Sequence, residues 1–307
     1  MSLIDENPPE APLGGDPLCY APAPTPAPIY TPLPDLPEDL RISWSWPHLL
    51  LFGSFIVVSQ FVVGILVVGY YSLNRHMSQA QLRKMLESDP KILVGVNVLL
   101  FALVFLFLYV TLAVLRDSPF WRTLGWKKLT PDPHSGKSNP WVYFFSGAGL
   151  AIFVAIASSR VKDADHAPIQ EFLKNRAGAL SLMAMAVFVA PLVEETVFRG
   201  YLYPVFVRIL SGIARYFGME YAAALRTSMA SSVLLTGILF GLMHGYQLGW
   251  TWGLVALLIL VGVIFTFARA WTGTVLASFL LHLGYNSMIA ITGIIATKGF
   301  TQIPPHP

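Results

Sequence analysis

Long apolar runs separated by short polar stretches dominate the pattern of residues along this chain. About 20 consecutive apolar residues span the hydrocarbon core of a bilayer as an α-helix. Seven stretches meet or approach that length: residues 49–71, 92–115, 141–158, 179–211, 228–246, 251–268 and 273–295. The pattern therefore predicts an all-α fold, a polytopic transmembrane helical bundle. It would have eight spans if the long fourth stretch folded back on itself.

The stretches between the apolar runs carry most of the charge. Their lysines and arginines are divided almost evenly between the two sides, and a slight excess favours a cytoplasmic N-terminus under the positive-inside rule. Tryptophan, which is typical of membrane interfaces, occurs at several predicted span ends: Trp44, Trp46, Trp141, Trp250 and Trp252. We therefore expect these rings to lie at the membrane surface.

Composition supports a membrane protein and excludes several other classes. Of the 307 residues, 55% are hydrophobic and only 12% are charged, whereas soluble domains are about 25% charged. The net charge of +3 is spread over the loops and gives no indication of nucleic-acid binding. The single cysteine, Cys19, excludes internal disulfides and cysteine-based metal or nucleophile sites within the membrane.

The chain divides into four parts by composition. Residues 1–43 include the Ala-Pro repeat at 21–28 and have no signal-peptide pattern, so we expect a disordered Pro-rich tail. Residues 44–175 hold the N-terminal transmembrane helices and their loops. Residues 176–297 form a second membrane part that carries buried polar residues, and residues 298–307 form a short tail.

Three polar clusters interrupt the apolar runs of the second membrane part. A charged side chain at mid-bilayer depth costs roughly 2.5–3.5 kcal/mol on insertion scales, so such residues need partners and mark functional sites. The clusters are Glu194, Glu195 and Arg199, then Phe240 and His244, then His282 and Asn286. We therefore treat all seven residues as candidates for a shared site.

Helical spacing separates the roles of the two glutamates. Glu195 and Arg199 are four residues apart and face each other, which predicts an ion pair. Glu194 is turned about 100° away and is left to bind and deprotonate a water molecule. A three-residue salt-bridge network that only joins helices is an equally good interpretation of this cluster alone.

The depth of Glu194 relative to His244 decides whether they can meet. If the fourth span ended near Phe198, the two side chains would be roughly 20 Å apart at opposite membrane faces. The conflict disappears if the membrane portion begins near Val187 and continues past Tyr203. We adopt that interpretation, which puts Glu194 roughly 10 Å inside the face that His244 approaches late in the next helix.

The two histidine clusters have both structural and chemical interpretations. A lone membrane histidine usually only satisfies hydrogen bonds, but beside a glutamate His244 can hold a water or protonate a leaving amine. His282 and Asn286, also four residues apart, could donate to an oxyanion, a donor worth about 2.7–4 kcal/mol. They could equally form interhelical hydrogen bonds of about 0.6 kcal/mol each.

Glycines recur at four-residue spacing in the helix that leads to His244. Gly237, Gly241 and Gly245 would let that helix approach a neighbour closely. Other hydrolytic patterns are missing from the sequence: there is no His-Glu-x-x-His, no Gly-x-Ser-x-Gly and no aspartate within the apolar spans. Glutamate, histidine and asparagine remain as the candidates for hydrolysis within the membrane.

Read together, EETVFR, FGLMH and HLGYN resemble the motif set of the CAAX-protease and bacteriocin-processing family, also called Abi, which includes type II CAAX prenyl endopeptidases. The resemblance covers about residues 176–297. It implies an intramembrane endopeptidase with no obligatory metal or other cofactor. By resemblance, Glu194 and His244 would activate water, and His282 and Asn286 would stabilise the oxyanion. Glu195, Arg199 and Phe240 would support the site.

The resemblance leaves the substrate open, because the stretch between the first and second motifs is longer than we expect for the prenyl-protease branch. A prenylated C-terminus, a leader peptide and a membrane-anchored segment are all candidates. The family also implies a multi-pass protein of a prokaryotic inner membrane. Three alternatives remain: a non-catalytic scaffold or immunity-type protein, a zinc hydrolase with Glu194, His244 and His282 as ligands, and a transporter with a carboxylate proton relay.

Overall fold

The computed structural model describes residues 36–75, 77–78, 80–81, 85, 89–130, 138–162 and 176–301. Within this part the fold is all-α, with no strand. The longer helices are α1 (Trp46–Arg75), α3 (Pro90–Leu108), α5 (Pro140–Ser158), α7 (Arg176–Ala184), α9 (Tyr203–Tyr216), α10 (Tyr221–Met243), α11 (Trp252–Thr272) and α12 (Val275–Ala296). Shorter helical segments are η1 (Glu38–Leu40), η2 (Tyr109–Val114), α4 (Phe120–Thr123), η4 (Met185–Val189), α8 (Ala190–Glu195) and η5 (Thr196–Leu202).

Seven helical spans in the described residues are long and apolar enough to cross a membrane. Each coincides with one of the apolar runs, so the predicted helical bundle is confirmed and the chain is an integral, multi-pass membrane protein. The fourth span runs from Arg176 to Tyr216 as one continuous helix of 41 residues. It does not fold back, so the eight-span alternative is wrong. At 1.5 Å per residue it is about 60 Å long, roughly twice the hydrocarbon thickness.

Two π-helical segments, η4 and η5, interrupt this long helix on either side of α8. Segments of this kind are rare and often occur at functional sites, because the wider turn changes the direction of neighbouring side chains. Here they flank the short stretch that carries Glu194 and Glu195. The local geometry of the first polar cluster therefore differs from that of a regular α-helix.

Local sequence signals start and stop the spans. The side chains of Asp89 and Asn139 accept hydrogen bonds from the first turns of α3 and α5, each followed by proline. Glu220 caps α10, and Thr274 caps α12. Gly273 ends α11 in the left-handed conformation, with φ of 72°, which glycine adopts without steric cost.

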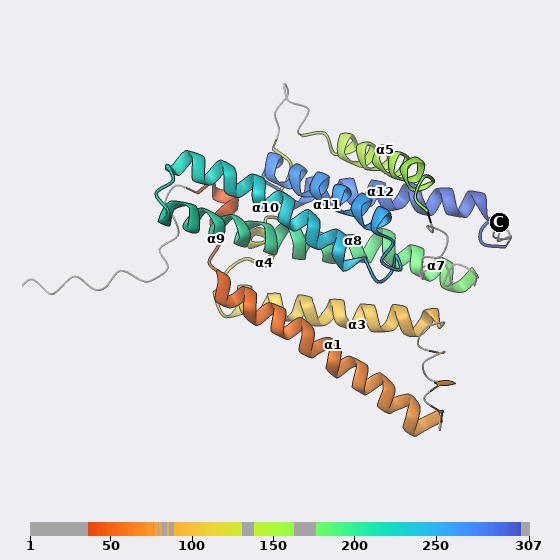
Figure 1. Ribbon diagram of the computed structural model, residues 1–307. Coiled ribbons are helices and arrows are strands. Elements are labelled where there is room, and N and C mark those ends of the chain that lie inside the picture. The colour runs from red at the N-terminus through yellow and green to blue at the C-terminus, as the bar shows by residue number, and fades with distance from the viewer. Residues whose placement is uncertain are drawn as a thin grey trace, which may run out of the picture.

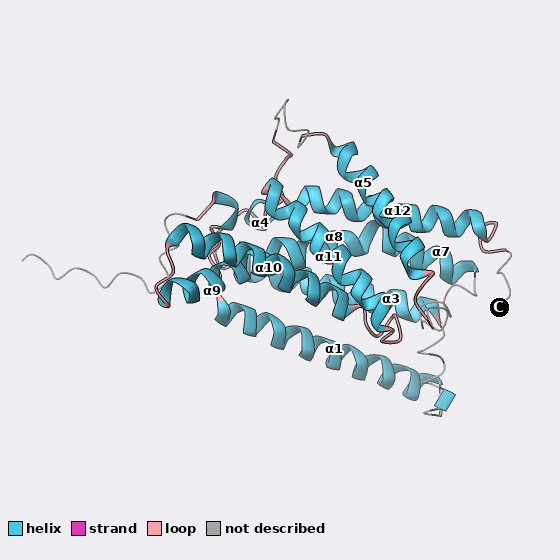
Figure 2. Ribbon diagram, turned by 45° about the horizontal axis from the view of Figure 1, so that its top comes forward, coloured by secondary structure: helices cyan, strands magenta, loops and turns pink. Residues whose placement is uncertain are grey.

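The core of the bundle is formed by α8–α12 and α5. Figure 1 shows α11 and α12 between α5 on one side and the α1–α3 pair on the other, and Figure 2 shows the same order. α5 packs on α12, and α10 packs between α9 and α11. These pairs place the three polar clusters of the sequence on helices that contact one another.

Glycines allow the closest of these contacts. A Cβ atom at Gly147 of α5 would collide with the backbone oxygen of Leu281, and one at Gly284 of α12 would collide with that of Phe144. In α10, the expected close approach is confirmed at Gly237 and Gly241, which lie against the backbone of α11. Gly245 instead lies under the ring of Trp250 in the turn that follows α10.

The α1–α3 pair lies at the edge of the bundle and is largely exposed, as expected for lipid-facing helices. Its contact with the core is aromatic: Phe52 packs on Tyr201, and His48 Nδ1 lies 2.7 Å from the Tyr201 hydroxyl. Trp44, two residues before α1, stacks on the same tyrosine ring. Trp44 is only 1% exposed. The expectation of an interfacial ring is therefore wrong for Trp44, because it stacks on Tyr201 inside the protein. The other four predicted tryptophans are exposed.

The segment before α1 is packed into the bundle. Leu36, Leu40 and Ile42 are buried, and Asp39 forms a 2.7 Å ion pair with Arg269 of α11. Residues from Leu36 on therefore pack against the bundle, although composition assigned residues 1–43 to a disordered tail. Residues 1–35, with the Ala-Pro repeat, and residues 302–307 lie outside the described part of the chain.

Candidate active site

The long helix places the first polar cluster at the centre of the bundle. Glu195 is the last residue of α8, and Arg199 lies in η5. The Arg199 guanidinium donates to Glu195 Oε1 at 2.9 Å, and both side chains are fully buried. This is the ion pair predicted from their spacing.

Arg199 also joins the long helix to α11. Its Nε donates to Thr266 Oγ1 at 3.2 Å, and its second terminal nitrogen donates to the Gly262 carbonyl at 2.9 Å. The guanidinium lies 4.5 Å from the centre of the Phe240 ring. A buried charge is tolerated only when it is paired and hydrogen-bonded. These contacts meet that requirement and explain why Phe240 belongs to the constellation.

His282 of α12 connects the two glutamates. Its Nδ1 lies 2.9 Å from Glu195 Oε1, and its Nε2 lies 3.9 Å from Glu194 Oε2. An ion-paired carboxylate can only accept a hydrogen bond, so we assign the proton to Nδ1. Glu195 therefore fixes both the orientation and the tautomer of the imidazole that faces Glu194.

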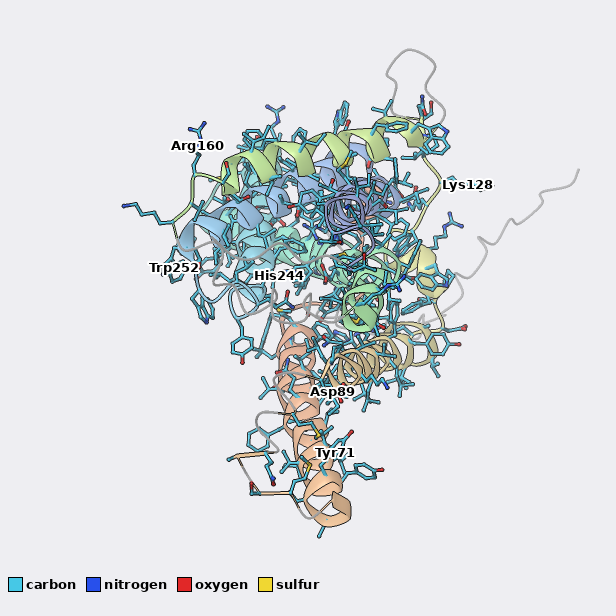
Figure 3. The ribbon with its side chains drawn as sticks, turned by 90° about the vertical axis from the view of Figure 1, so that its right-hand side faces the viewer. Tyr71, Asp89, Lys128, Arg160, His244 and Trp252 are labelled. Carbon is cyan, nitrogen blue, oxygen red and sulfur yellow. The ribbon has the colours of Figure 1, made fainter. Side chains whose placement is uncertain are left out.

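His244 approaches Glu194 from the end of α10. It is the first residue after the helix rather than a residue within it, because the helix ends at Met243. Nδ1 donates to the Phe240 carbonyl at 2.8 Å, so Nε2 of the neutral ring carries a lone pair. This Nε2 lies 3.9 Å from Glu194 Oε2, which confirms that the two groups share one depth. In Figure 3, His244 lies closer to the middle of the molecule than Trp252 and Arg160 do.

Glu194 is the unpaired carboxylate of the site. Its Oε2 is buried and has no hydrogen-bond partner among the described residues, while 18% of the side chain is exposed. A separation of 3.9 Å is too long for a direct hydrogen bond, but two atoms that far apart can both lie about 2.8 Å from one water oxygen. Glu194 thus faces both imidazoles at the spacing of a water-bridged contact.

Asn286 lies one turn beyond His282 on α12, but its side chain makes no hydrogen bond to the other candidates within the described structure. Its Nδ2 donates to the carbonyl of Ala186 in η4 at 2.7 Å. That bond joins α12 to the long helix and uses one of the two amide hydrogens, which leaves the other available. The structure therefore brings six of the seven sequence candidates into one contact network and places Asn286 beside it.

Trp126 and Thr196 belong to the surroundings of the site but were not indicated by the sequence. Trp126 Nε1 donates to Thr196 Oγ1, beside Glu195, at 3.1 Å. The same indole packs edge-on against Phe279, three residues before His282. Trp126 thus contacts both helices that carry the site. It lies in a charged loop, where the sequence pattern offers no signal of burial against a helix.

No group of three or more His, Cys, Asp or Glu side chains arranged to hold a metal ion is found in the part of the chain that the structure describes. The site consists of a carboxylate that faces two imidazoles, and a buried ion pair supports it. Such a group of side chains can move protons to and from a water molecule.

Comparison with known proteins agrees with the motif pattern. The family model described as Type II CAAX prenyl endopeptidase Rce1-like matches residues 176–288. This range includes all seven candidate residues and confirms the resemblance seen in the sequence. No curated protein and no solved structure matches the chain. The match supports a membrane-embedded peptidase of the CAAX-protease type.

Proposed function

From the match to type II CAAX prenyl endopeptidases, we propose that this protein is an intramembrane endopeptidase that hydrolyses peptide bonds with a glutamate-activated water and without a metal. The observation that carries the proposal is the pair of 3.9 Å separations between Glu194 Oε2 and the Nε2 atoms of His244 and His282. The substrate would be a prenylated or otherwise membrane-anchored peptide, and the membrane a prokaryotic inner membrane.

In the proposed reaction, Glu194 removes a proton from the water, and the water oxygen attacks the peptide carbonyl carbon. The neutral Nε2 of His244 accepts the other water hydrogen and so orients the nucleophile. The proton taken up by Glu194 is then delivered to the leaving nitrogen as the carbon–nitrogen bond breaks. General acid–base catalysis of this kind contributes typically 10²–10⁴-fold to the rate.

His282 and Asn286 are proposed to stabilise the oxyanion. His282 can donate from Nε2 only as an imidazolium, because Glu195 already binds the Nδ1 hydrogen. The remaining amide hydrogen of Asn286 is the second proposed donor.

The proposal is tested by substituting Glu194→Gln in purified, reconstituted protein supplied with prenylated peptides and leader-type peptides. Cleavage should fall by at least about 10²-fold, while expression and thermal unfolding stay unchanged. Glu220→Gln is the matched control, because Glu220 only caps α10 and should keep the full rate. Full activity of the Glu194→Gln variant would end the proposal.

Two further outcomes would change the assignment. We expect the rate to persist with excess chelator, and loss that zinc restores would indicate metal hydrolysis through Glu194, His244 and His282. If the protein cleaves no peptide but retains a binding partner after His244→Ala, the scaffold interpretation is correct.

A further inference from the structure

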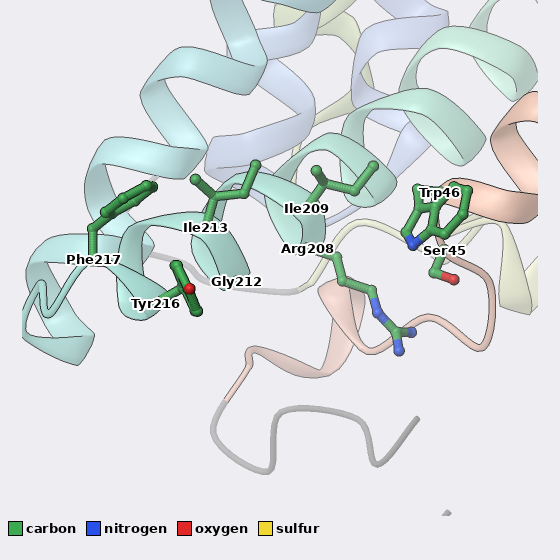
Figure 4. A pocket seen from close by; sticks show the side chains of 8 residues that line it. All are labelled: Ser45, Trp46, Arg208, Ile209, Gly212, Ile213, Tyr216 and Phe217. Atoms are coloured by element: carbon green, nitrogen blue, oxygen red, sulfur yellow. The ribbon is translucent and has the colours of Figure 1, made fainter. Parts of the chain in front are cut away.

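A second site lies at the far end of the long helix, away from the proposed catalytic residues. A groove of about 550 Å³ runs between the start of α1 and the last two turns of α9. Figure 4 shows Trp46 near one end of the groove, Phe217 near the other, and Gly212 between them. Volumes of about 300–1,000 Å³ are typical of ligand sites.

The groove lies at a membrane–water boundary. Trp46 is the first residue of the first span, and Tyr216 is the last residue of the fourth, and both line the groove. Gly212 is about 27 Å from Glu194 along the helix axis, so the groove is not part of the catalytic site. Aromatic side chains at two span ends are typical of the headgroup level of a bilayer.

The groove has an apolar floor and a basic margin. Ile209, Gly212, Ile213 and Tyr216 follow the 3-4-7 spacing of one helical face. A Cβ atom at Gly212 would meet nothing within 4 Å, so the floor is open at its centre. Arg208 also lines the groove, where it donates to the backbone oxygens of Ile42 and Trp44 and is held in place.

Positive charge prevails at this end of the protein. Arg215 lies seven residues after Arg208, on the same side of α9, beyond the residues that line the groove, and its guanidinium lies 5.3 Å from the centre of the Tyr221 ring. Among the described residues of the connecting segments at this end, basic side chains outnumber acidic ones. The basic residues are Arg41, Arg116, Arg122, Lys127 and Lys128, and the acidic residues are Glu38, Asp39, Asp117 and Glu220. A ligand with an apolar chain and a negative head fits both the floor and the margin.

We propose that this groove binds one anionic phospholipid of the bilayer. The upper methylenes of an acyl chain pack on Ile209 and Ile213 over the open floor at Gly212, and the phosphate lies between Arg208 and Arg215. Basic residues beside a membrane attract anionic lipids in this way. This role is independent of the peptidase proposal, since it requires none of the residues near Glu194.

The test is retention of lipid by the full-length protein. The protein is purified in detergent with a mixture of phosphatidylglycerol and phosphatidylcholine, and native mass spectrometry measures the bound lipid. We expect one phosphatidylglycerol to be retained and phosphatidylcholine to be lost. Gly212→Leu fills the floor and should abolish retention. The matched control, Gly53→Leu, also adds a side chain where a Cβ meets nothing, on exposed α1, and should not change it.

A charge variant separates lipid recognition from free-anion binding. Arg215→Gln should weaken retention about fivefold, the effect of one basic residue at a charged membrane surface. Inorganic phosphate added alone should not displace the lipid, because it cannot fill the apolar floor. Equal retention by Gly212→Leu, no preference for phosphatidylglycerol, or displacement by phosphate would each overturn the proposal.

Discussion

At the residue scale, two adjacent glutamates show how surroundings divide one side-chain type into two roles. Glu195 has an arginine and a histidine within 2.9 Å and is fully buried. Glu194, one position earlier and turned toward the histidine Nε2 atoms, makes no hydrogen bond in the described structure, whereas Glu195 leaves only its Oε2 without a partner. Glu195 is therefore suited to hold the site together, and Glu194 to react.

We predict that Arg199→Met destabilises the protein by about 3–5 kcal/mol, because it leaves the Glu195 carboxylate buried without its main cation. The double variant Glu195→Met, Arg199→Met should recover much of that loss, since no uncompensated charge remains in the pair. Thermal unfolding in detergent measures both. A single variant as stable as the parent protein would show that the buried pair is not needed for folding.

At the element scale, the spans are bounded by short polar signals that an apolar-run count misses. α10 begins at Tyr221, seven residues before the predicted start at 228. Glu220 caps the helix there, and Arg226 is tolerated because it lies near the first turn. The same helix ends at Met243, so His244 leaves the helix axis and can turn toward Glu194. Helix boundaries therefore matter directly for the geometry of the site.

Glu220 gives a pH prediction for this cap. The backbone N–H groups of Ala222 and Ala223 donate to its carboxylate and hold its pKa below the ordinary value. A lowered folded-state pKa stabilises the fold above the ordinary carboxyl pKa, and that stabilisation is lost as pH falls through the lowered pKa. The parent protein should melt higher than Glu220→Gln at neutral pH. The two melting temperatures should converge in acid, and a constant difference would contradict the cap.

The contact between α5 and α12 gives a prediction with a control on the same helix. Gly147→Ala should cost about 1–3 kcal/mol, because its Cβ would collide with the Leu281 backbone one residue before His282. Gly149→Ala should be neutral or slightly stabilising, since its Cβ meets nothing. Thermal unfolding of the two variants compares them, and equal effects would rule out close packing at Gly147.

At the scale of the whole molecule, the spans set which segments share a membrane face. Met219 precedes α10 and Tyr246 follows it, and both side chains are exposed. In a Cys19→Ser background, Met219→Cys and Tyr246→Cys should react with an impermeant thiol reagent from opposite sides of sealed vesicles. Labelling of both from one side would show that α10 does not cross the membrane.

The depth of the site is also a property of the whole molecule. α12 continues for about 21 Å beyond His282, and the long helix extends for about 27 Å before Glu194. α10 ends at the level of Glu194, since His244 follows it directly. The turn after α10 therefore lies at the depth of Glu194, whereas α12 and the long helix both extend beyond that depth. This arrangement suits access of water to the proposed catalytic glutamate within the membrane.

The sequence alone determined the fold class, the seven spans and most of the candidate site. The length of an apolar run indicates whether a segment can span the bilayer. Charged residues are costly within a span, so Glu194, Glu195 and Arg199 could be identified as candidates for a functional site. Four-residue spacing was enough to pair Glu195 with Arg199, because that contact lies within one helix.

Only the tertiary structure decided how the helices combine these residues. The bond from His282 to Glu195, the approach of His244 and the contact of Trp126 with Thr196 join segments far apart in sequence. Such contacts depend on helix ends, on π segments that rotate side chains, and on glycines that set distances between axes. Helix ends and π segments have no periodic signature, and the glycine spacing of α10 does not identify the helix that it approaches. Hydrophobic patterning therefore could not locate these contacts.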